Sequence, residues 1–166
     1  LPNALLSNKG KAIENPGEWE QFRREEVLEL FTSHVYGRVH QSEVSIDFEL
    51  VYVNKRALGG SAVMKEVEVN VHNGGKELQF TMLIFLPSDA QGAVPLFLGL
   101  NFNGNHTIHP SPEITITDNW VPNKPEIGVS ENRAMEQSRG MRFRKWPVEM
   151  ILARGYGLAT IYCGEI

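Results

Sequence analysis

A long amphipathic helix is the first element that the pattern of apolar and polar positions predicts. Asn15 as N-cap, Pro16 in the first helical position and Glu18 closing a capping box form a helix-start signal. Apolar side chains then recur at three- and four-residue steps, at Trp19, Phe22, Val27, Leu30, Phe31 and Val35. Gly37 is the expected stop. The apolar stripe predicts a face that packs against the rest of the fold rather than a ligand site.

Three β-strands follow, each marked by alternating apolar and polar side chains. The three runs are residues 46–53, 63–71 and 78–86, and the turn signals between them are Gly59-Gly60 and Asn73-Gly74-Gly75. Strands joined by short turns pair antiparallel, so a β-meander is predicted. One face of this meander is apolar and the other is charged, and the edge near Glu66 and Glu68 is expected to face water.

The pattern of apolar and polar residues changes after the meander. Residues 94–100 are almost continuously apolar, which is typical of a strand covered on both faces inside a parallel sheet. A long irregular stretch, residues 103–138, comes next, and loops of this length are usually functional or disordered. Residues 144–149 then open a short helix, in which Trp146, Met150 and Ile151 are the expected inner contacts.

A second buried strand is predicted at residues 158–163. The order strand, loop, helix, strand is the signature of a parallel α/β unit. Ile166 follows this core strand almost directly, and domains rarely end at such a point, so a second half of the domain is expected beyond it.

Composition and charge exclude some classes of function. Hydrophobic residues make up 42% of the chain and charged residues 22%, as in a soluble globular protein. The net charge is -4, and no cluster of lysines and arginines stands out, so nucleic acid is not an expected partner. No apolar run approaches the roughly 20 residues of a membrane span. The chain starts without a signal peptide, as a secreted or periplasmic protein does once its leader is removed.

The loop after the first buried strand holds the candidate site residues Asn103, Gly104, Asn105 and His106. Loops at the carboxyl ends of strands in open α/β sheets bind ligands. In α/β-hydrolases this loop supplies backbone N–H groups to the developing oxyanion, and Gly104 would let the backbone approach a substrate closely. The alternative is a tight turn in which asparagine side chains cap their own backbone.

No other group of residues forms a convincing chemical site. His106 and His109 have a spacing close to that of metal ligands, but Pro110 and Pro112 speak against a helix and no further ligand is evident, so no metal is expected. Structural or surface roles are expected for three further histidines, His34, His40 and His72. Cys163 lies in an apolar run, where most cysteines are inert packing residues.

A catalytic residue cannot be assigned within the chain. Three acids, Asp118, Glu149 and Glu165, lie nearest the edge of the presumed site, and Glu165 is well placed but has no evident partner. A Gly-x-Ser-x-Gly nucleophile elbow is absent, and no serine has the strand-turn-helix context that a nucleophile requires. The serines are Ser7, Ser33, Ser42, Ser45, Ser61, Ser88, Ser111, Ser130 and Ser138.

Several stretches together resemble the bacterial glucuronoyl esterases, a carbohydrate esterase family often labelled acetyl xylan esterase. The opening helix (16–28 and 34–38), the first buried strand with its loop (95–107), and residues 139–140 and 146–160 carry this resemblance. It implies the N-terminal part of a three-layer α/β/α hydrolase without a cofactor. It also implies a serine nucleophile followed by an arginine, with an acid and a histidine, all of which lie beyond the strand at 158–163.

The resemblance implies an ester hydrolase that cleaves esters of glucuronic acid on xylan with lignin alcohols. We divide the partial domain into an N-terminal helix region (1–40), antiparallel strands (41–92) and the start of the parallel unit (93–166). The chain alone is expected to be inactive. The alternatives are an acetyl xylan esterase and a non-catalytic carbohydrate-binding or interaction module. The expected partners are the polysaccharide ester and either the missing C-terminal half or a second copy of the chain.

Overall fold

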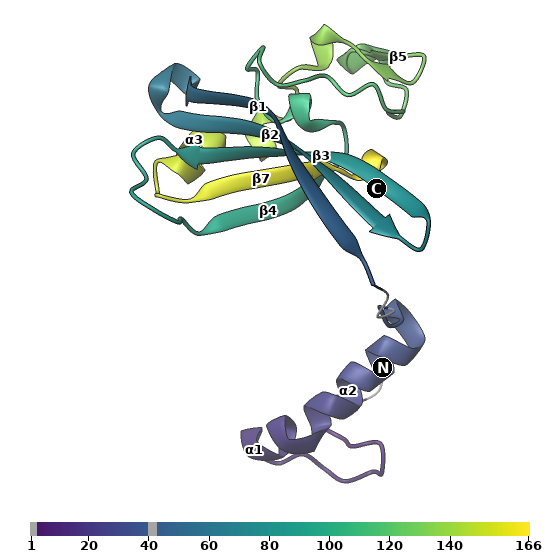
Figure 1. Cartoon of the computed structure of the whole chain (residues 1–166). Helices are drawn as coiled ribbons and strands as arrows, with labels where there is room; N and C mark the ends of the chain where they lie inside the picture. Colours follow the sequence, from purple (N-terminus) through teal and green to yellow (C-terminus); the bar gives the residue numbers. More distant parts are fainter. Residues whose placement is uncertain (1–2, 40–42) are drawn as a thin grey trace. The chain divides into compact units, whose positions relative to one another are not determined.

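The computed structural model describes residues 3–39 and 43–166. The chain divides into two compact units, Leu1–Ser42 and Glu43–Ile166 (Figure 1). Two residues named in the predictions, His40 and Ser42, lie outside the described residues. Among the residues that the structure describes, no helix is long and apolar enough to cross a membrane.

The predicted helix is present in the N-terminal unit and starts where the capping signal lies. The Asn15 Oδ1 accepts a hydrogen bond of 3.0 Å from the Glu18 N–H, and the Glu18 carboxylate reaches back to the Glu14 N–H at 3.0 Å. Gly37, with a φ of +76°, follows the last turn. The helix consists of α1 (Pro16–Glu18), a π-helical segment (Trp19–Arg23), α2 (Arg24–Phe31) and a second π-helical segment (Thr32–Tyr36).

A buried arginine fixes this helix to the segment before it. Arg23 is 4% exposed, and its guanidinium donates to the Ala4 carbonyl, the Asn8 side chain and the Glu26 carboxylate at 2.8–3.1 Å. The later part of the predicted apolar stripe stays exposed within this unit, including Phe31 and Val35. That this stripe packs against another part of the protein therefore stays a prediction.

The second unit is built on a mixed five-stranded sheet in the order β1-β2-β3-β7-β4 (Figure 1). The strands β1, β2 and β3 form the predicted antiparallel meander, and β4 and β7 form the predicted parallel pair. Gly74 and Gly75, with φ of +55° and +82°, make the tight turn between β2 and β3. The bounds are β1 (Ser45–Ala57), β2 (Ala62–Asn73), β3 (Lys76–Pro87), β4 (Leu96–Asn101) and β7 (Gly157–Tyr162).

One face of the sheet carries the main hydrophobic core. Helix α3 (Val148–Leu152) and the long loop after β4 contribute Ile108, Ile114, Val148 and Leu152 to it. Trp146 and Ile151 pack against this core as predicted, whereas Met150 is 50% exposed and its prediction was wrong. The helix begins at Val148, after Pro147, and its buried residues are Val148 and Leu152.

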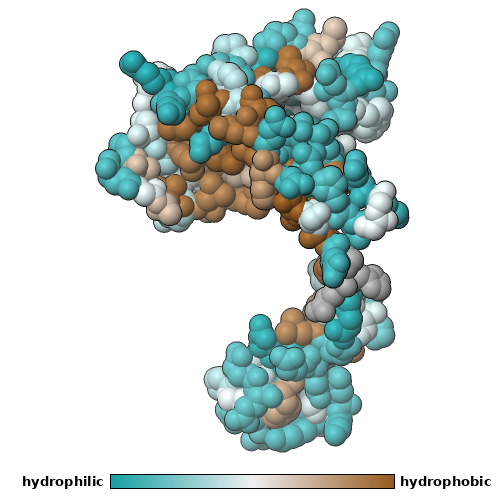
Figure 2. Space-filling model, viewed as in Figure 1, coloured by the Kyte–Doolittle hydropathy of each residue, from teal (hydrophilic) through white to brown (hydrophobic). Residues whose placement is uncertain are grey.

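The opposite face of the sheet is apolar, and no element of the second unit covers it. Leu98 of β4 is 63% exposed and Phe48 of β1 is 69% exposed. Figure 2 shows the hydrophobic side chains gathered on this face. The prediction that residues 94–100 are covered on both faces is wrong within the second unit, because β4 is an edge strand and no element of this unit packs over this side.

An isolated chain with this face is expected to self-associate. An exposed apolar face beside an open strand edge favours pairing between copies. Light scattering of the purified chain should give a mass above that of the monomer. Leu98→Lys, which puts a charge on β4, should lower that mass, while Met135→Lys, which charges an exposed side chain in the long loop, should leave it unchanged. A monodisperse wild-type monomer would contradict this prediction.

Candidate functional site

The loop after β4 is held together by one buried side chain, that of Asn101. Its Nδ2 donates to the Asn105 Oδ1 at 2.7 Å and to the Thr160 Oγ1 of β7 at 3.1 Å. Its Oδ1 accepts from the Gly104 N–H at 2.9 Å. The turn in which an asparagine side chain caps its own backbone is thus present, and it fixes the loop to both parallel strands.

The four predicted site residues lie together, but they differ in their hydrogen-bond partners and in their position relative to the surface. Asn103 is 8% exposed, and its Oδ1 accepts from the Arg142 Nε at 2.9 Å. The Asn105 side chain donates to the Thr81 carbonyl of β3 at 2.9 Å. His106 is fully buried. Among these four, Asn103 lines a surface hollow, and the others build the loop behind it.

His106 forms a pair with Ser138, which resembles a catalytic serine-histidine pair only in composition. The His106 Nε2 lies 2.8 Å from the Ser138 Oγ, and that hydroxyl donates to the Met135 carbonyl at 2.6 Å. The imidazole therefore donates to the hydroxyl, while its Nδ1 is buried and has no partner among the described residues. Both side chains are fully buried, so no substrate reaches the serine.

The buried imidazole should make stability depend on pH. Burial, with a smaller effect of Arg139, lowers the pKa of His106 from 6.5 to about 4. The unfolded chain therefore takes up this proton at a higher pH than the folded chain does. As the pH falls from about 6.5 to about 4, the free energy of unfolding should fall by up to about 3 kcal/mol through this group alone.

Urea unfolding of the wild type and of His106→Gln, between pH 8 and pH 4, measures this effect. The glutamine can still donate to Ser138 and does not titrate. The difference between the two proteins should stay constant above pH 7 and change steadily below pH 6.5. A difference that is flat over the whole range would show that His106 titrates normally in the folded chain.

His109 is not directed to a shared metal site with His106. Its Nε2 lies 3.0 Å from the Glu149 Oε1, and its Nδ1 accepts from the Ser111 N–H at 3.0 Å. The hydrogen bond from His109 lowers the pKa of Glu149. Within the residues that the structure describes, no group of three or more histidines, cysteines or acids could hold a metal ion.

Two glutamates that were predicted to lack a partner or to face water instead fasten the long loop to the sheet. Glu165 accepts from the Thr81 N–H at 2.8 Å and from the Thr117 hydroxyl at 3.1 Å, so the expectation that it lacks a partner is wrong. Glu66 is 2% exposed and accepts from the Thr115 N–H and hydroxyl at 2.8 and 2.7 Å. The expectation that Glu66 faces water is also wrong, because the long loop covers this core-bearing face of the sheet and supplies the donors.

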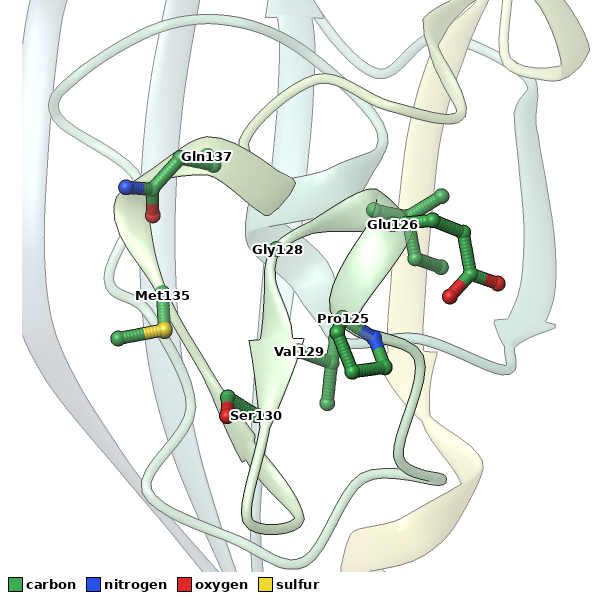
Figure 3. A pocket seen from close by; sticks show the side chains of 8 residues that line it. Pro125, Glu126, Gly128, Val129, Ser130, Met135 and Gln137 are labelled. Atoms are coloured by element: carbon green, nitrogen blue, oxygen red, sulfur yellow. The ribbon is translucent and has the colours of Figure 1, made fainter.

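The long loop also contains a small hairpin that the sequence pattern did not predict. The strands β5 (Val129–Ser130) and β6 (Arg133–Ala134) pair beside a hollow of about 360 Å³, with Met135 on one side and Pro125 on the other (Figure 3). Val121 and Val129 pack on Tyr162 at the end of β7, and partly exposed Cys163 packs against them. The Tyr162 hydroxyl donates to the Trp120 carbonyl at 2.8 Å. Asp118 is exposed, and its carbonyl accepts from Arg133.

The candidate site is a hollow of about 420 Å³ at the carboxyl end of β4. Its lining includes Asn103 and Thr107 of the loop, the cationic side chains Arg142 and Lys145, and the indole of Trp146. The Trp146 ring packs over Gly99, where an added Cβ would come within 3.2 Å of it. The Asn103 N–H makes no hydrogen bond within the described chain, whereas the Gly104 N–H is taken by Asn101.

Arg142 was not among the predicted site residues, although the sequence contains a signal for it. Four basic side chains fall within residues 139–145, just before α3: Arg139, Arg142, Arg144 and Lys145. Of these, Arg139 is committed to Glu136 and to loop carbonyls, and Arg144 is exposed beside Phe143. Only the structure shows that Arg142 and Lys145 line the hollow beside Asn103.

Comparison with known proteins gives several strong matches. No family model matches the chain. The carbohydrate esterase MZ0003, from an unknown prokaryotic organism, is 41% identical over 169 residues, which cover 100% of this chain and 38% of that protein. The structure of a promiscuous CE15 esterase from a marine bacterial metagenome is 41% identical with a TM-score of 0.84, and a glucuronoyl esterase from Solibacter usitatus is 33% identical with a TM-score of 0.83. The chain is covered completely by both structures and covers 41% of each.

The mixed sheet, with its parallel pair β4 and β7 and a site loop at their carboxyl ends, is a partial α/β-hydrolase-like fold. The chain is a homologue of the CE15 glucuronoyl esterases, and it corresponds to their N-terminal part. It spans about two fifths of the length of the relatives that it matches.

Proposed function

We propose that this chain forms the oxyanion side of an esterase that hydrolyses esters of glucuronic acid on xylan. The observation that carries the proposal is the free Asn103 N–H in a loop at the carboxyl end of β4, beside a hollow. In α/β-hydrolases, an N–H group from the loop after the corresponding strand and one from the residue after the nucleophile stabilise the oxyanion together.

The rigidity of the loop supports this role. Donors stabilise a developing charge best when they are held in place before the reaction. Asn101 ties the loop to β7, Asn105 ties it to β3, and Arg142 holds the Asn103 side chain. The loop is thus fixed from three sides while one backbone donor is left unused.

The free edge of β4 is the place where we expect the strand that carries the nucleophile. Within the described sheet, β4 pairs with β7 on one side and with no strand on the other. We propose that a further parallel strand pairs there and carries the nucleophilic serine on the turn at its carboxyl end. Such a serine would stand next to Asn103, across the mouth of the hollow.

The proposed reaction consumes one water molecule. The serine oxygen adds to the ester carbonyl, the bond from that carbon to the alcohol oxygen breaks, and the alcohol leaves with the serine proton. Water then adds to the acyl-serine, the serine is released, and the uronic acid leaves as a carboxylate with loss of a proton. An insoluble wall polymer as substrate would require a secreted or periplasmic enzyme, which is part of the proposal.

A chimera tests the proposal, with residues 1–166 replacing the matching segment of the 41% identical carbohydrate esterase. Methyl glucuronate ester and acetylated xylan are assayed side by side. The proposal expects kcat/KM on the glucuronate ester to exceed that on the acetyl ester at least about tenfold. A higher kcat/KM on acetylated xylan would support the alternative function, that of an acetyl xylan esterase. Binding of xylan by a folded chimera with no turnover of either ester would support the non-catalytic module.

A further inference from the structure

We infer that Arg142 binds the carboxylate of a uronic acid in this hollow and positions Asn103 for the reaction. The inference deepens the proposed function and rests on it for the reaction, but its binding part concerns the chain alone. The ligand class is a pyranose that carries a carboxylate, with glucuronate as the simplest example.

Arg142 is fixed to the site loop at two points. Its backbone N–H donates to the Thr107 carbonyl at 2.8 Å, and its Nε donates to the Asn103 Oδ1 at 2.9 Å. The side chain is half-buried. Its guanidinium therefore has a defined direction, and a ligand that binds it pays little of the side-chain entropy that an exposed arginine would lose.

The remaining guanidinium N–H groups are unused. Across the described residues, Arg142 has no ion-pair partner and no side-chain hydrogen bond besides that to Asn103. Two other arginines that are not exposed behave differently, because Arg23 pairs with Glu26 and Arg139 pairs with Glu136. Among the arginines that the structure describes, Arg142 is thus the one that is not exposed and has no carboxylate partner, although the chain is acidic overall.

The hollow has the charge and the wall that such a ligand needs. None of its lining residues is acidic, and Lys145 adds a second positive charge. A guanidinium binds a carboxylate with two parallel hydrogen bonds, which is the strongest geometry available to it. The Trp146 indole supplies an apolar wall for the carbon-bound hydrogens of a sugar ring.

The charge of the reacting group explains why an arginine is useful here. The ester substrate is neutral at its acyl carbon, the transition state develops a negative oxygen, and the product is a carboxylate. Arg142 should therefore stabilise the transition state and the product more than the substrate, which raises kcat rather than lowering KM. It should also make glucuronate a product inhibitor.

Calorimetric titration of the 166-residue chain with sodium glucuronate, and with glucose as the neutral probe, tests the binding part. Glucuronate should bind and glucose should not bind measurably. Arg142→Met should weaken glucuronate at least about tenfold. Arg142→Lys, which keeps the charge but not the paired donors, should give an intermediate value. The matched control, Arg144→Met, removes an exposed neighbouring charge and should leave binding unchanged.

If the wild-type chain binds glucuronate no better than glucose, or if Arg142→Met retains the wild-type preference, the inference is wrong. A merely structural role for Arg142 would lower the melting temperature without changing the ratio of the two affinities. If Arg142→Met does not fold, Arg142→Lys takes its place in this comparison. The ratio of its affinity for glucuronate to its affinity for glucose must then still be lower than that of the wild type.

The kinetic part separates this inference from the proposed function. In the chimera, Arg142→Met should lower kcat on methyl glucuronate about 10- to 100-fold with a small change in KM. An active chimera that is indifferent to Arg142→Met would overturn the inference and leave the esterase proposal standing. An inactive chimera with glucuronate binding that depends on Arg142 would overturn the esterase proposal alone.

Discussion

The 166-residue chain alone is expected to hydrolyse methyl glucuronate no faster than buffer does. None of the described serines lies on a strand-turn-helix elbow, and Ser138, which has a histidine partner, is fully buried. Loss of a nucleophile typically costs about four to six orders of magnitude in kcat, and the oxyanion donors alone cannot replace it. Release of methanol or of acid at constant pH measures the rate.

The chimera serves as the positive control, because it contains the same residues 1–166 together with the remaining part of a related esterase. Ser138→Ala in the isolated chain is the control for the buried serine and should leave the background rate unchanged. Turnover by the isolated chain above background that Ser138→Ala abolishes would show that the His106–Ser138 pair is catalytic, and the assignment of that pair to structure would be wrong.

Gly104→Ala is expected to destabilise the second unit by more than about 3 kcal/mol. Gly104 has a φ of +98°, where a Cβ is strained. The added Cβ would also lie 2.6 Å from the His106 Cε1 and 3.0 Å from the Thr117 Cγ2. His106 cannot move aside easily, because it is fully buried and bound to Ser138. Urea unfolding followed by circular dichroism measures the loss.

Gly155→Ala is the matched control for the backbone strain. Gly155 has a φ of +78°, and a Cβ added there would meet no atom within 4 Å. It should therefore cost only the strain of the positive φ, about 1 kcal/mol. Equal losses in the two variants would mean that the contact between Gly104 and His106 is unimportant, and the description of the loop as tightly packed would fail.

The parts of the fold that local signals specify could be predicted from sequence. Asn15 and Glu18 lie within one helical turn of the helix start, and Gly74-Gly75 sits between two alternating strands. These signals depend on neighbours in the chain, so no knowledge of the tertiary structure is needed to interpret them. The parallel pairing of β4 and β7 was predictable because their continuous apolar runs are typical of one kind of sheet.

Long-range partners could not be predicted in the same way. Glu66 is polar in an alternating strand, which normally indicates solvent, and its donors lie on Thr115, 49 residues away. The candidate site also depends on a contact between residues far apart in the chain. The rule for carboxyl-end loops located Asn103–His106, but the residue that orders Asn103 is Arg142, 39 residues along the chain.

A structure of the chimera bound covalently to a glucuronate-like phosphonate tests the central claim most directly, because the phosphonate mimics the tetrahedral intermediate. The account predicts that the serine strand pairs with the free edge of β4 and that the Asn103 nitrogen lies about 2.7–3.1 Å from a phosphonate oxygen. It also predicts that the Arg142 guanidinium contacts the same group. A phosphonate oxygen more than about 5 Å from Asn103, beyond any hydrogen bond, would contradict the claim that this loop forms the oxyanion side of the site.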